Sequence, residues 1–68
     1  MLKLGKYRHF KGKEYEVLGV ARHSETLEAL VVYCALYGKK QLWVRLKKMF
    51  LEKVSVNGKK IQRFKPIK

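Results

Sequence analysis

The sequence predicts an all-β fold, a small bent barrel of five or six short strands with one short helical or 3₁₀ turn, and three observations lead to it. The chain has 68 residues, of which 47% are hydrophobic, so it can bury one core but not two. Its glycines fall at short intervals between segments rich in β-branched and aromatic residues, as is typical of short strands. An Asn-Gly pair between two such segments is the strongest local hairpin signal.

The first half of the chain predicts a hairpin and a polar loop. Residues 6–10 and 14–22 flank Gly12, as expected of two strands joined by a tight turn. The large residues of the second strand change parity along its length, and Gly19 lies at the change, so we expect a bend or bulge there. The polar residues 23–28 then predict a turn or the start of a helical turn.

The second half predicts four more strand segments and one helical turn. The β-branched and aromatic run 30–37 is expected to be the central strand, and 42–45 follows as a short alternating strand. Residues 46–50 have the length of one helical turn. The pair Asn57-Gly58 supplies the two positive φ angles of a type I′ turn within the hairpin 51–64.

These elements together predict an SH3-like barrel. Short strands without a full-length helix have few ways to bury an apolar face, and closing the sheet also protects its edges. We expect a single domain over residues 1–68, with its core at 5–64 and a short basic tail at 65–68.

The cysteine content and the apolar runs predict the compartment. A single cysteine, Cys34, excludes an internal disulfide, and its apolar neighbours favour a buried, inert thiol. The N-terminus lacks an apolar core of signal-peptide length, and the longest uncharged run, residues 29–38, is too short to span a bilayer. We therefore expect a soluble cytoplasmic protein without membrane contact.

Four sequence blocks, taken in order, resemble one known family. They are Tyr-Arg-His-Phe-Lys-Gly at 7–12, His-Ser-Glu-Thr at 23–26, Ala-Leu-Tyr-Gly at 35–38 and Trp-Val-Arg at 43–45. Together they resemble the bacterial and phage domain-of-unknown-function family numbered 1653, from Gly5 to Phe64. The resemblance implies an SH3-like barrel and leaves the biochemical role open.

The chain departs from the family pattern after two of these blocks. In similar sequences Ala-Leu-Tyr-Gly is commonly followed by acidic or glycine residues, and Trp-Val-Arg by a proline and an acidic residue. Here those places hold Lys39, Lys40, Leu46, Lys47 and Lys48. The departure adds positive charge on loops expected to be neighbours, so a nucleic-acid role can apply to this member without applying to its relatives.

Catalytic and metal sites are not expected. The chain has no aspartate, and its candidate nucleophiles and bases are scattered. His9, His23 and Cys34 lack the paired spacing of a zinc site, so we expect no enzyme activity, metal or cofactor. In the polar loop, Ser24 or Thr26 is expected to cap the turn, with a functional role for the loop as the alternative.

Charge is the most informative property of the sequence. The formal net charge is +12, with six basic and four acidic residues in 1–28 against eleven and one in 29–68. Cations interleaved with aromatic residues suit a phosphate backbone with stacked bases. We hypothesise a nucleic-acid-binding module, for RNA or DNA, that reads mainly the phosphate backbone with low sequence specificity. The candidate residues are Tyr37, Lys39, Lys40, Arg45, Lys47, Lys48, Lys59, Lys60 and Arg63.

Two alternatives use the same charge. The first is a pocket that binds or sequesters a nucleotide or another phosphorylated small molecule, built from Arg8, His9, His23, Ser24 and Arg45 at one end of the barrel. The second is an adaptor that uses its basic face to bind an acidic protein partner. The lysines can also serve solubility alone.

Three arginines and two aromatic residues have competing interpretations. Arg8, Arg22 and Arg45 can ligate an anion or pair with a glutamate across strands. Pairing is favoured for Arg22, and both interpretations stay open for Arg45. Trp43 and Phe50 are expected in the core, as are most aromatic residues in so small a domain.

Overall fold

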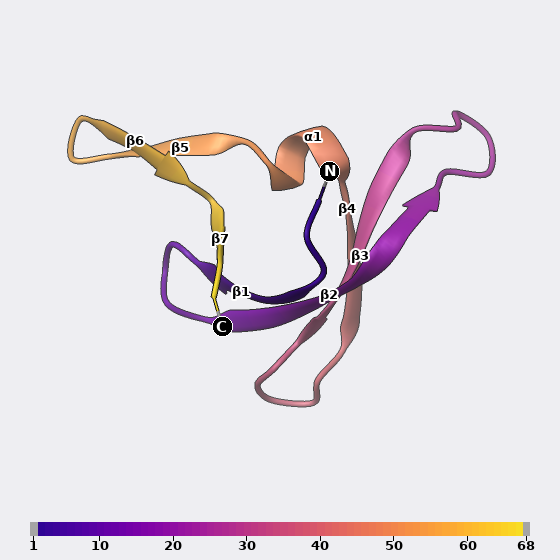
Figure 1. Cartoon of the computed structure of the whole chain (residues 1–68), viewed down its shortest axis with the longest axis horizontal. Helices are drawn as coiled ribbons and strands as arrows, with labels where there is room; N and C mark the ends of the chain where they lie inside the picture. The colour runs from indigo at the N-terminus through magenta and orange to yellow at the C-terminus, as the bar shows by residue number, and fades with distance from the viewer. Residues whose placement is uncertain (1, 68) are drawn as a thin grey trace.

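A five-stranded antiparallel sheet and a separate hairpin make up most of the molecule. The computed structural model describes residues 2–67, and Figure 1 shows how its strands and its short helix are arranged. The elements in chain order are β1 (Gly5–His9), β2 (Glu14–Arg22), β3 (Ala29–Ala35), β4 (Leu42–Leu46), α1 (Lys47–Phe50), β5 (Lys53–Val56), β6 (Lys59–Gln62) and β7 (Phe64–Pro66).

The order of strands in the sheet is that of an SH3-like barrel. From one edge to the other it runs β4-β3-β2-β1-β7, so consecutive strands are neighbours and the last strand returns beside the first. Strands β5 and β6 form a two-stranded sheet of their own, inserted between α1 and β7 (Figure 1). The predicted all-β barrel with one helical turn is therefore confirmed.

Three details of the expected elements differ. The described residues form seven strands instead of five or six, because the segment 59–64 breaks at Arg63 into β6 and β7. Lys65 and Pro66, expected in a basic tail, lie in β7, which pairs with β1; Lys68 lies outside the described residues. The central strand is β2 and not β3, because the return of β7 adds a strand on the β1 side.

Strand β2 bends at a bulge, as Gly19 predicts. Val17 lies opposite Tyr33 and Gly19 lies opposite Val32, so Leu18 is an extra residue on β2. A bulge bends its strand and increases the local twist. The bend lets β2 pair with β1 through its first half and with β3 on both sides of the bulge.

The turn between β5 and β6 has the predicted geometry. Asn57 has φ 52° and Gly58 has φ 79°, the two positive values of a type I′ turn. Val56 and Lys59 lie opposite each other on either side of it, so the turn sets the register of the hairpin.

Among residues 2–67, a cluster of six buried side chains forms the core. Its members are Tyr7, Val17, Val31, Tyr33, Phe50 and Phe64. Phe50, at the end of α1, is 1% exposed, and its ring stacks on that of Phe64 with the centroids 4.2 Å apart. The single turn of helix thus carries an aromatic ring onto the core, and the expectation for Phe50 is confirmed.

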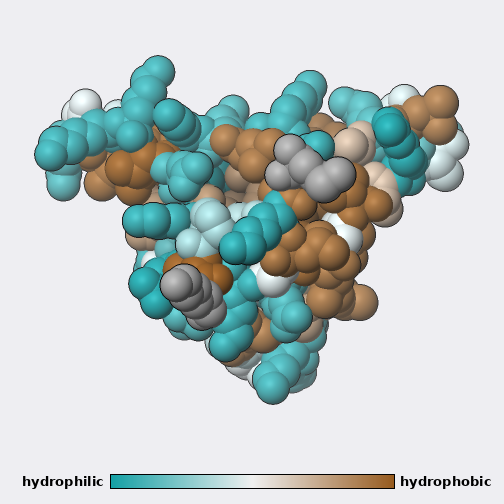
Figure 2. Space-filling view, viewed as in Figure 1, coloured by the Kyte–Doolittle hydropathy of each residue, from teal (hydrophilic) through white to brown (hydrophobic). Residues whose placement is uncertain are grey.

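Two other expected core residues lie nearer the surface. Trp43 is 48% exposed, because β4 is an edge strand and its first three residues are open to solvent. Cys34 is half-buried, and its Sγ donates a hydrogen bond to the Lys40 carbonyl at 3.2 Å. Figure 2 shows that apolar residues gather on the side of the molecule formed by β2, β3 and β4, while hydrophilic residues prevail toward the β5–β6 hairpin.

Candidate nucleic-acid interface

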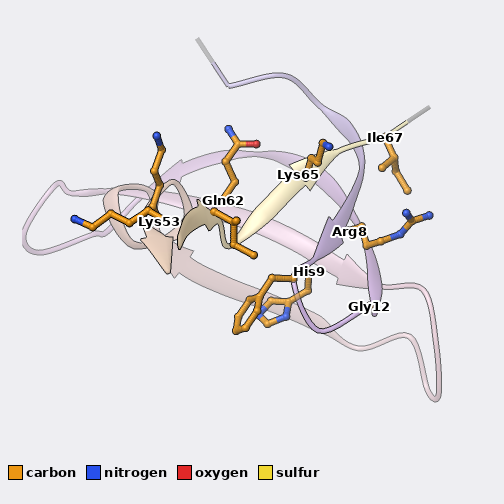
Figure 3. Close-up of a pocket in the computed structure, with 10 residues that line it drawn as sticks. Arg8, His9, Gly12, Lys53, Gln62, Lys65 and Ile67 are labelled. Atoms are coloured by element: carbon orange, nitrogen blue, oxygen red, sulfur yellow. The ribbon is translucent and has the colours of Figure 1, made fainter. Parts of the chain in front are cut away.

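A groove runs between the β5–β6 hairpin and the β1–β7 edge of the sheet, with a volume of about 540 Å³ (Figure 3). Backbone hydrogen bonds hold the hairpin in place. The Phe10 amide donates to the Arg63 carbonyl at 2.9 Å, and the Arg63 amide donates to the Glu52 carbonyl at 3.3 Å. The groove therefore forms where the chain turns from β6 into β7 and returns along β1.

Four cationic side chains line this groove. They are Arg8 from β1, Lys53 from β5, Lys60 from β6 and Lys65 from β7. Within residues 2–67, no acidic side chain lines the groove, and none of these three lysines takes part in an ion pair. Arg8 is paired with Glu14 at 3.0 Å, the cross-strand pair that the sequence left open.

Two of these cations face each other across a strand pair. Arg8 lies directly opposite Lys65 in the register of β1 and β7. Like charges in this position repel and destabilise the sheet. The Glu14 carboxylate offsets one of the two charges, and an anion bound between the side chains would offset the other.

Three apolar side chains also line the groove, namely Phe10, Ile61 and Ile67. The ring of Phe10 packs on that of His9 with the centroids 4.6 Å apart and the planes 35° from parallel. The Nζ atom of Lys11 lies 5.8 Å from the centroid of the Phe10 ring. The groove thus offers an aromatic face and aliphatic groups beside its cations, which suits bases as well as phosphates.

His9 supplies a neutral hydrogen-bond donor at the groove. Burial lowers the pKa of His9 below its usual range, and the nearby positive charges of Arg63, Arg45 and Lys11 lower it further. The Nδ1 atom accepts a hydrogen bond from the Lys11 amide at 3.2 Å, which assigns the ring proton to Nε2. The lowered pKa favours the uncharged ring at neutral pH, and no hydrogen bond among residues 2–67 uses its Nε2–H.

Arg45 does not line this groove and lies instead in an aromatic cluster. Its Nε donates to the Tyr33 hydroxyl at 3.4 Å, and its guanidinium carbon lies 5.8 Å from the centroid of the Phe64 ring. No ion pair among residues 2–67 includes Arg45. Of the two interpretations left open, pairing with a glutamate is therefore wrong, and the arginine keeps its charge without a carboxylate.

Tyr37 is held by a neighbour and is not a free stacking platform. Its hydroxyl lies 2.6 Å from that of Tyr15, and the Nζ atom of Lys13 lies 4.8 Å from the centroid of its ring. Burial, followed by the hydrogen bond to Tyr37, raises the pKa of Tyr15 to about 12. Tyr15 therefore stays protonated at neutral pH, and its contact with Tyr37 buttresses the aromatic cluster.

The nine residues predicted to bind nucleic acid lie in three separate places. Tyr37, Lys39 and Lys40 lie in the β3–β4 loop, Arg45, Lys47 and Lys48 at the end of β4 and on α1, and Lys59, Lys60 and Arg63 on β6 and just after it. Of the nine, Lys60 lines the groove. Two of the others are paired: Arg63 with Glu52 at 2.9 Å and Lys48 with Glu28 at 3.9 Å.

The alternative anion pocket is not assembled in the structure. Arg8 and His9 belong to β1, and Arg8 lies opposite the first residue of β2, whereas His23 and Ser24 follow the last residue of β2. The eight residues between correspond to about 26 Å of extended strand. Arg8 and His9 therefore meet Lys53, Lys60 and Lys65 in the groove instead of the polar loop.

The polar loop is folded by its own hydrogen bonds. The Nδ1 atom of His23 accepts bonds from the amides of Glu25 and Thr26, at 3.1 and 3.3 Å, and the Thr26 hydroxyl accepts one from the Glu28 amide at 3.3 Å. The capping expected of Ser24 or Thr26 is thus performed by Thr26 together with His23. Arg22 donates to the Leu27 carbonyl at 3.0 Å, so the expectation that it pairs with a glutamate is wrong.

The sequence did not single out Lys53, Lys65, Phe10 or Ile61 as groove residues. The Asn-Gly turn fixes the register of β5 and β6, and Lys53 follows from that register because it lies near Lys60 on the neighbouring strand. The position of Lys65 in the groove depends on the pairing of β7 with β1, which are far apart in the chain. No local pattern carries that information.

Residues 2–67 contain neither a metal-ligating cluster nor a helix that could span a membrane. No group of three or more His, Cys or Glu side chains is placed to hold a metal ion in this part of the chain. The same residues contain no helix of the length and apolar character needed to cross a bilayer.

The fold and the groove together define a small SH3-like β-barrel with a cationic groove on one side. The chain belongs to the family described as a protein of unknown function, DUF1653, whose family model matches residues 5–66. It is similar to a protein of that family from Bordetella bronchiseptica whose crystal structure is known, with 37% identity and a TM-score of 0.89 over 97% of this chain and 87% of that one. A comparison with curated proteins found no match.

Proposed function

We propose that this protein binds single-stranded nucleic acid along the groove between β1–β7 and the β5–β6 hairpin. The observation that carries the proposal is the placement of Arg8 directly opposite Lys65 in a groove that no acidic side chain lines within residues 2–67. An anion bound between the two side chains would relieve this repulsion and so stabilise the sheet.

The other lining residues favour a polymer over a single phosphate. Lys53 on β5 and Lys60 on β6 extend the positive charge onto the hairpin. Figure 3 shows Lys53 away from Arg8 and Lys65. Phe10 and Ile61 offer surface for the faces of bases, which a single strand exposes and a duplex hides. The Nε2–H of His9 can donate to a phosphate or a base oxygen.

The chemistry of these cations favours weak sequence selectivity. Three of the four are lysines, which act as point charges, whereas the bidentate fork that reads a base edge belongs to arginine. The fourth, Arg8, already engages Glu14. Affinity should therefore come mainly from phosphate contacts and should depend steeply on salt.

The test measures binding of a labelled single-stranded RNA, a single-stranded DNA and a DNA duplex by fluorescence anisotropy across a salt series. The groove variant carries Lys53→Ala, Lys60→Ala and Lys65→Ala. Its matched control carries Lys39→Ala, Lys40→Ala and Lys48→Ala, which remove the same charge from other surfaces. Because three phosphate contacts are lost, we expect the groove variant to bind weakly, with a slope of log affinity against log salt shallower by about 2.

The control variant should keep most of the affinity and the salt slope. Equal losses in both variants would show that net charge alone attracts the polymer, and tighter binding of the duplex would contradict a site for single strands. If none of the three polymers binds at low salt, the proposed function is wrong.

A further inference from the structure

The two edges of the five-stranded sheet differ in how they resist pairing with another strand. The edge strand β7 has three residues, and two of them are Lys65 and Pro66, which natural proteins use to block edges. The opposite edge strand, β4, has five residues and contains no lysine or proline. Leu42 is 66% exposed and Val44 is 60% exposed. An edge of this kind is a template for strand addition.

The backbone of β4 has free hydrogen-bonding groups at alternate residues. The Ala35 amide donates to the Gln41 carbonyl at 3.1 Å, which makes this a hydrogen-bonded pair of the antiparallel ladder. Such pairs alternate, so Trp43 and Arg45 also bond to β3 across the ladder. The amides of Leu42, Val44 and Leu46 and the carbonyls of Leu42 and Val44 therefore point away from β3, toward the open edge. The Leu46 carbonyl is not free, because Leu46 is the N-cap of α1 and its carbonyl accepts the first hydrogen bond of that helix.

This strand is complementary to a second copy of itself. When two β4 strands run antiparallel about a twofold axis at Val44, Leu42 of each copy faces Leu46 of the other. The Val44 amides and carbonyls then pair with each other, and each Leu46 amide pairs with the Leu42 carbonyl of the other copy. Trp43 then lies beside Arg45 of the second copy, an aromatic ring beside a guanidinium. The strand's one charge thus meets a favourable partner across the axis.

We propose that two copies of this protein pair through β4 to form one continuous ten-stranded sheet. The interface joins the exposed Leu42 and Val44 side chains of both copies, next to the half-buried Val32 of β3. Two five-residue strands bury less than the roughly 800 Å² per partner of a standard interface, so the dimer is weak and depends on concentration. It forms independently of the nucleic-acid groove, which lies at the other edge of the sheet.

Charge should oppose this dimer and salt should strengthen it. Each copy carries a net charge of +12, and Lys47 and Lys48 follow β4 at the ends of the paired strands. Screening weakens the repulsion between copies as ionic strength rises. Salt thus acts on the dimer in the direction opposite to its action on the binding of nucleic acid.

The test is sedimentation equilibrium of the full chain, freed of nucleic acid, over a range of concentrations at low and high salt. We expect the mass to rise with concentration from 8.1 kDa toward twice that value, and more readily at high salt. The decisive variant is Val44→Pro, because Val44 has an amide that points outward and proline removes that amide without breaking the β3–β4 ladder. This variant should stay monomeric.

Two more variants complete the test. Val44→Lys places two lysines on the twofold axis, so this variant should also be monomeric. It replaces Val44→Pro as the test if the circular dichroism spectrum shows that the proline variant does not fold. Leu18→Lys adds the same charge on β2, at an exposed residue away from the edge, and should dimerise like the parent chain. A chain that stays monomeric up to millimolar concentration, or a dimer that survives both Val44 variants, would overturn the proposal.

Discussion

The two edges of the sheet are exposed to water at an energetic cost that has a different physical origin at each edge. On the β1–β7 side, cations from four strands crowd a groove that has no acidic lining residue within residues 2–67, so that side is electrostatically unsatisfied. On the β4 side, apolar side chains and free backbone groups are open to water, so that side is unsatisfied in hydrophobic and hydrogen-bonding terms. The cost is charge repulsion at the first edge and exposed apolar and hydrogen-bonding groups at the second. Each edge therefore suits a partner of a different chemistry.

The largest effect should come from removing the ring that α1 places on the core. Phe50→Ala loses the stacked contact with Phe64 and the edge contact with Tyr7, and leaves a cavity. We expect the free energy of unfolding to fall by about 3 to 5 kcal/mol, as measured by urea denaturation. Trp43→Ala, on the exposed edge, should cost less than about 1 kcal/mol, and similar losses in both variants would contradict the assignment of Trp43 to the surface.

A smaller effect should follow from changing the histidine of the polar loop. His23→Ala removes the acceptor for the Glu25 and Thr26 amides, so we expect a loss of about 1 kcal/mol in thermal or chemical unfolding. His23→Asn keeps an acceptor near the same place and should recover part of that loss. Binding of nucleic acid should be unchanged in both variants, and a selective loss of binding would show that the loop belongs to the site.

Because Arg8 and Lys65 repel each other across β1 and β7, removing this repulsion should raise stability and lower the affinity for nucleic acid. Lys65→Glu turns the cross-strand neighbour of Arg8 into an acid, so we expect the protein to become more stable by about 0.2 to 1 kcal/mol. The same change should weaken nucleic-acid binding, because it places a negative charge in the groove. A variant that is less stable and binds equally well would remove the argument drawn from this pair.

The smallest effect concerns pH. Because the pKa of His9 is lowered in the folded protein, the unfolded chain binds more protons as pH falls below 6.5. Stability should therefore decline from about pH 7 toward pH 5, and His9→Gln should flatten that decline in a series of melting curves. A bound phosphate should raise the pKa of His9, so binding should tighten over the same range, and an opposite trend would place the ligand elsewhere.

Local patterns predicted most of the fold and little of the groove. The glycine spacing, the parity change at Gly19 and the Asn57-Gly58 turn are short-range signals, and each corresponds to an observed element. The exposure of Trp43 and the return of β7 beside β1 depend on which strands become edges, which is set by packing across the whole chain. The groove joins four strands, so its lysines share a surface without sharing a motif.

The β5–β6 hairpin contributes no residue to the buried core of residues 2–67, although it forms one wall of the groove. Its turn is specified by two adjacent residues, and its ends join α1 and β7 through one or two residues each. Because the barrel does not depend on these side chains for its packing, substitutions in the hairpin are largely free of the constraints that act on the core. The hairpin is therefore the part of this molecule in which ligand preference can diverge between relatives while the barrel stays the same, and it is the natural place to graft a new specificity.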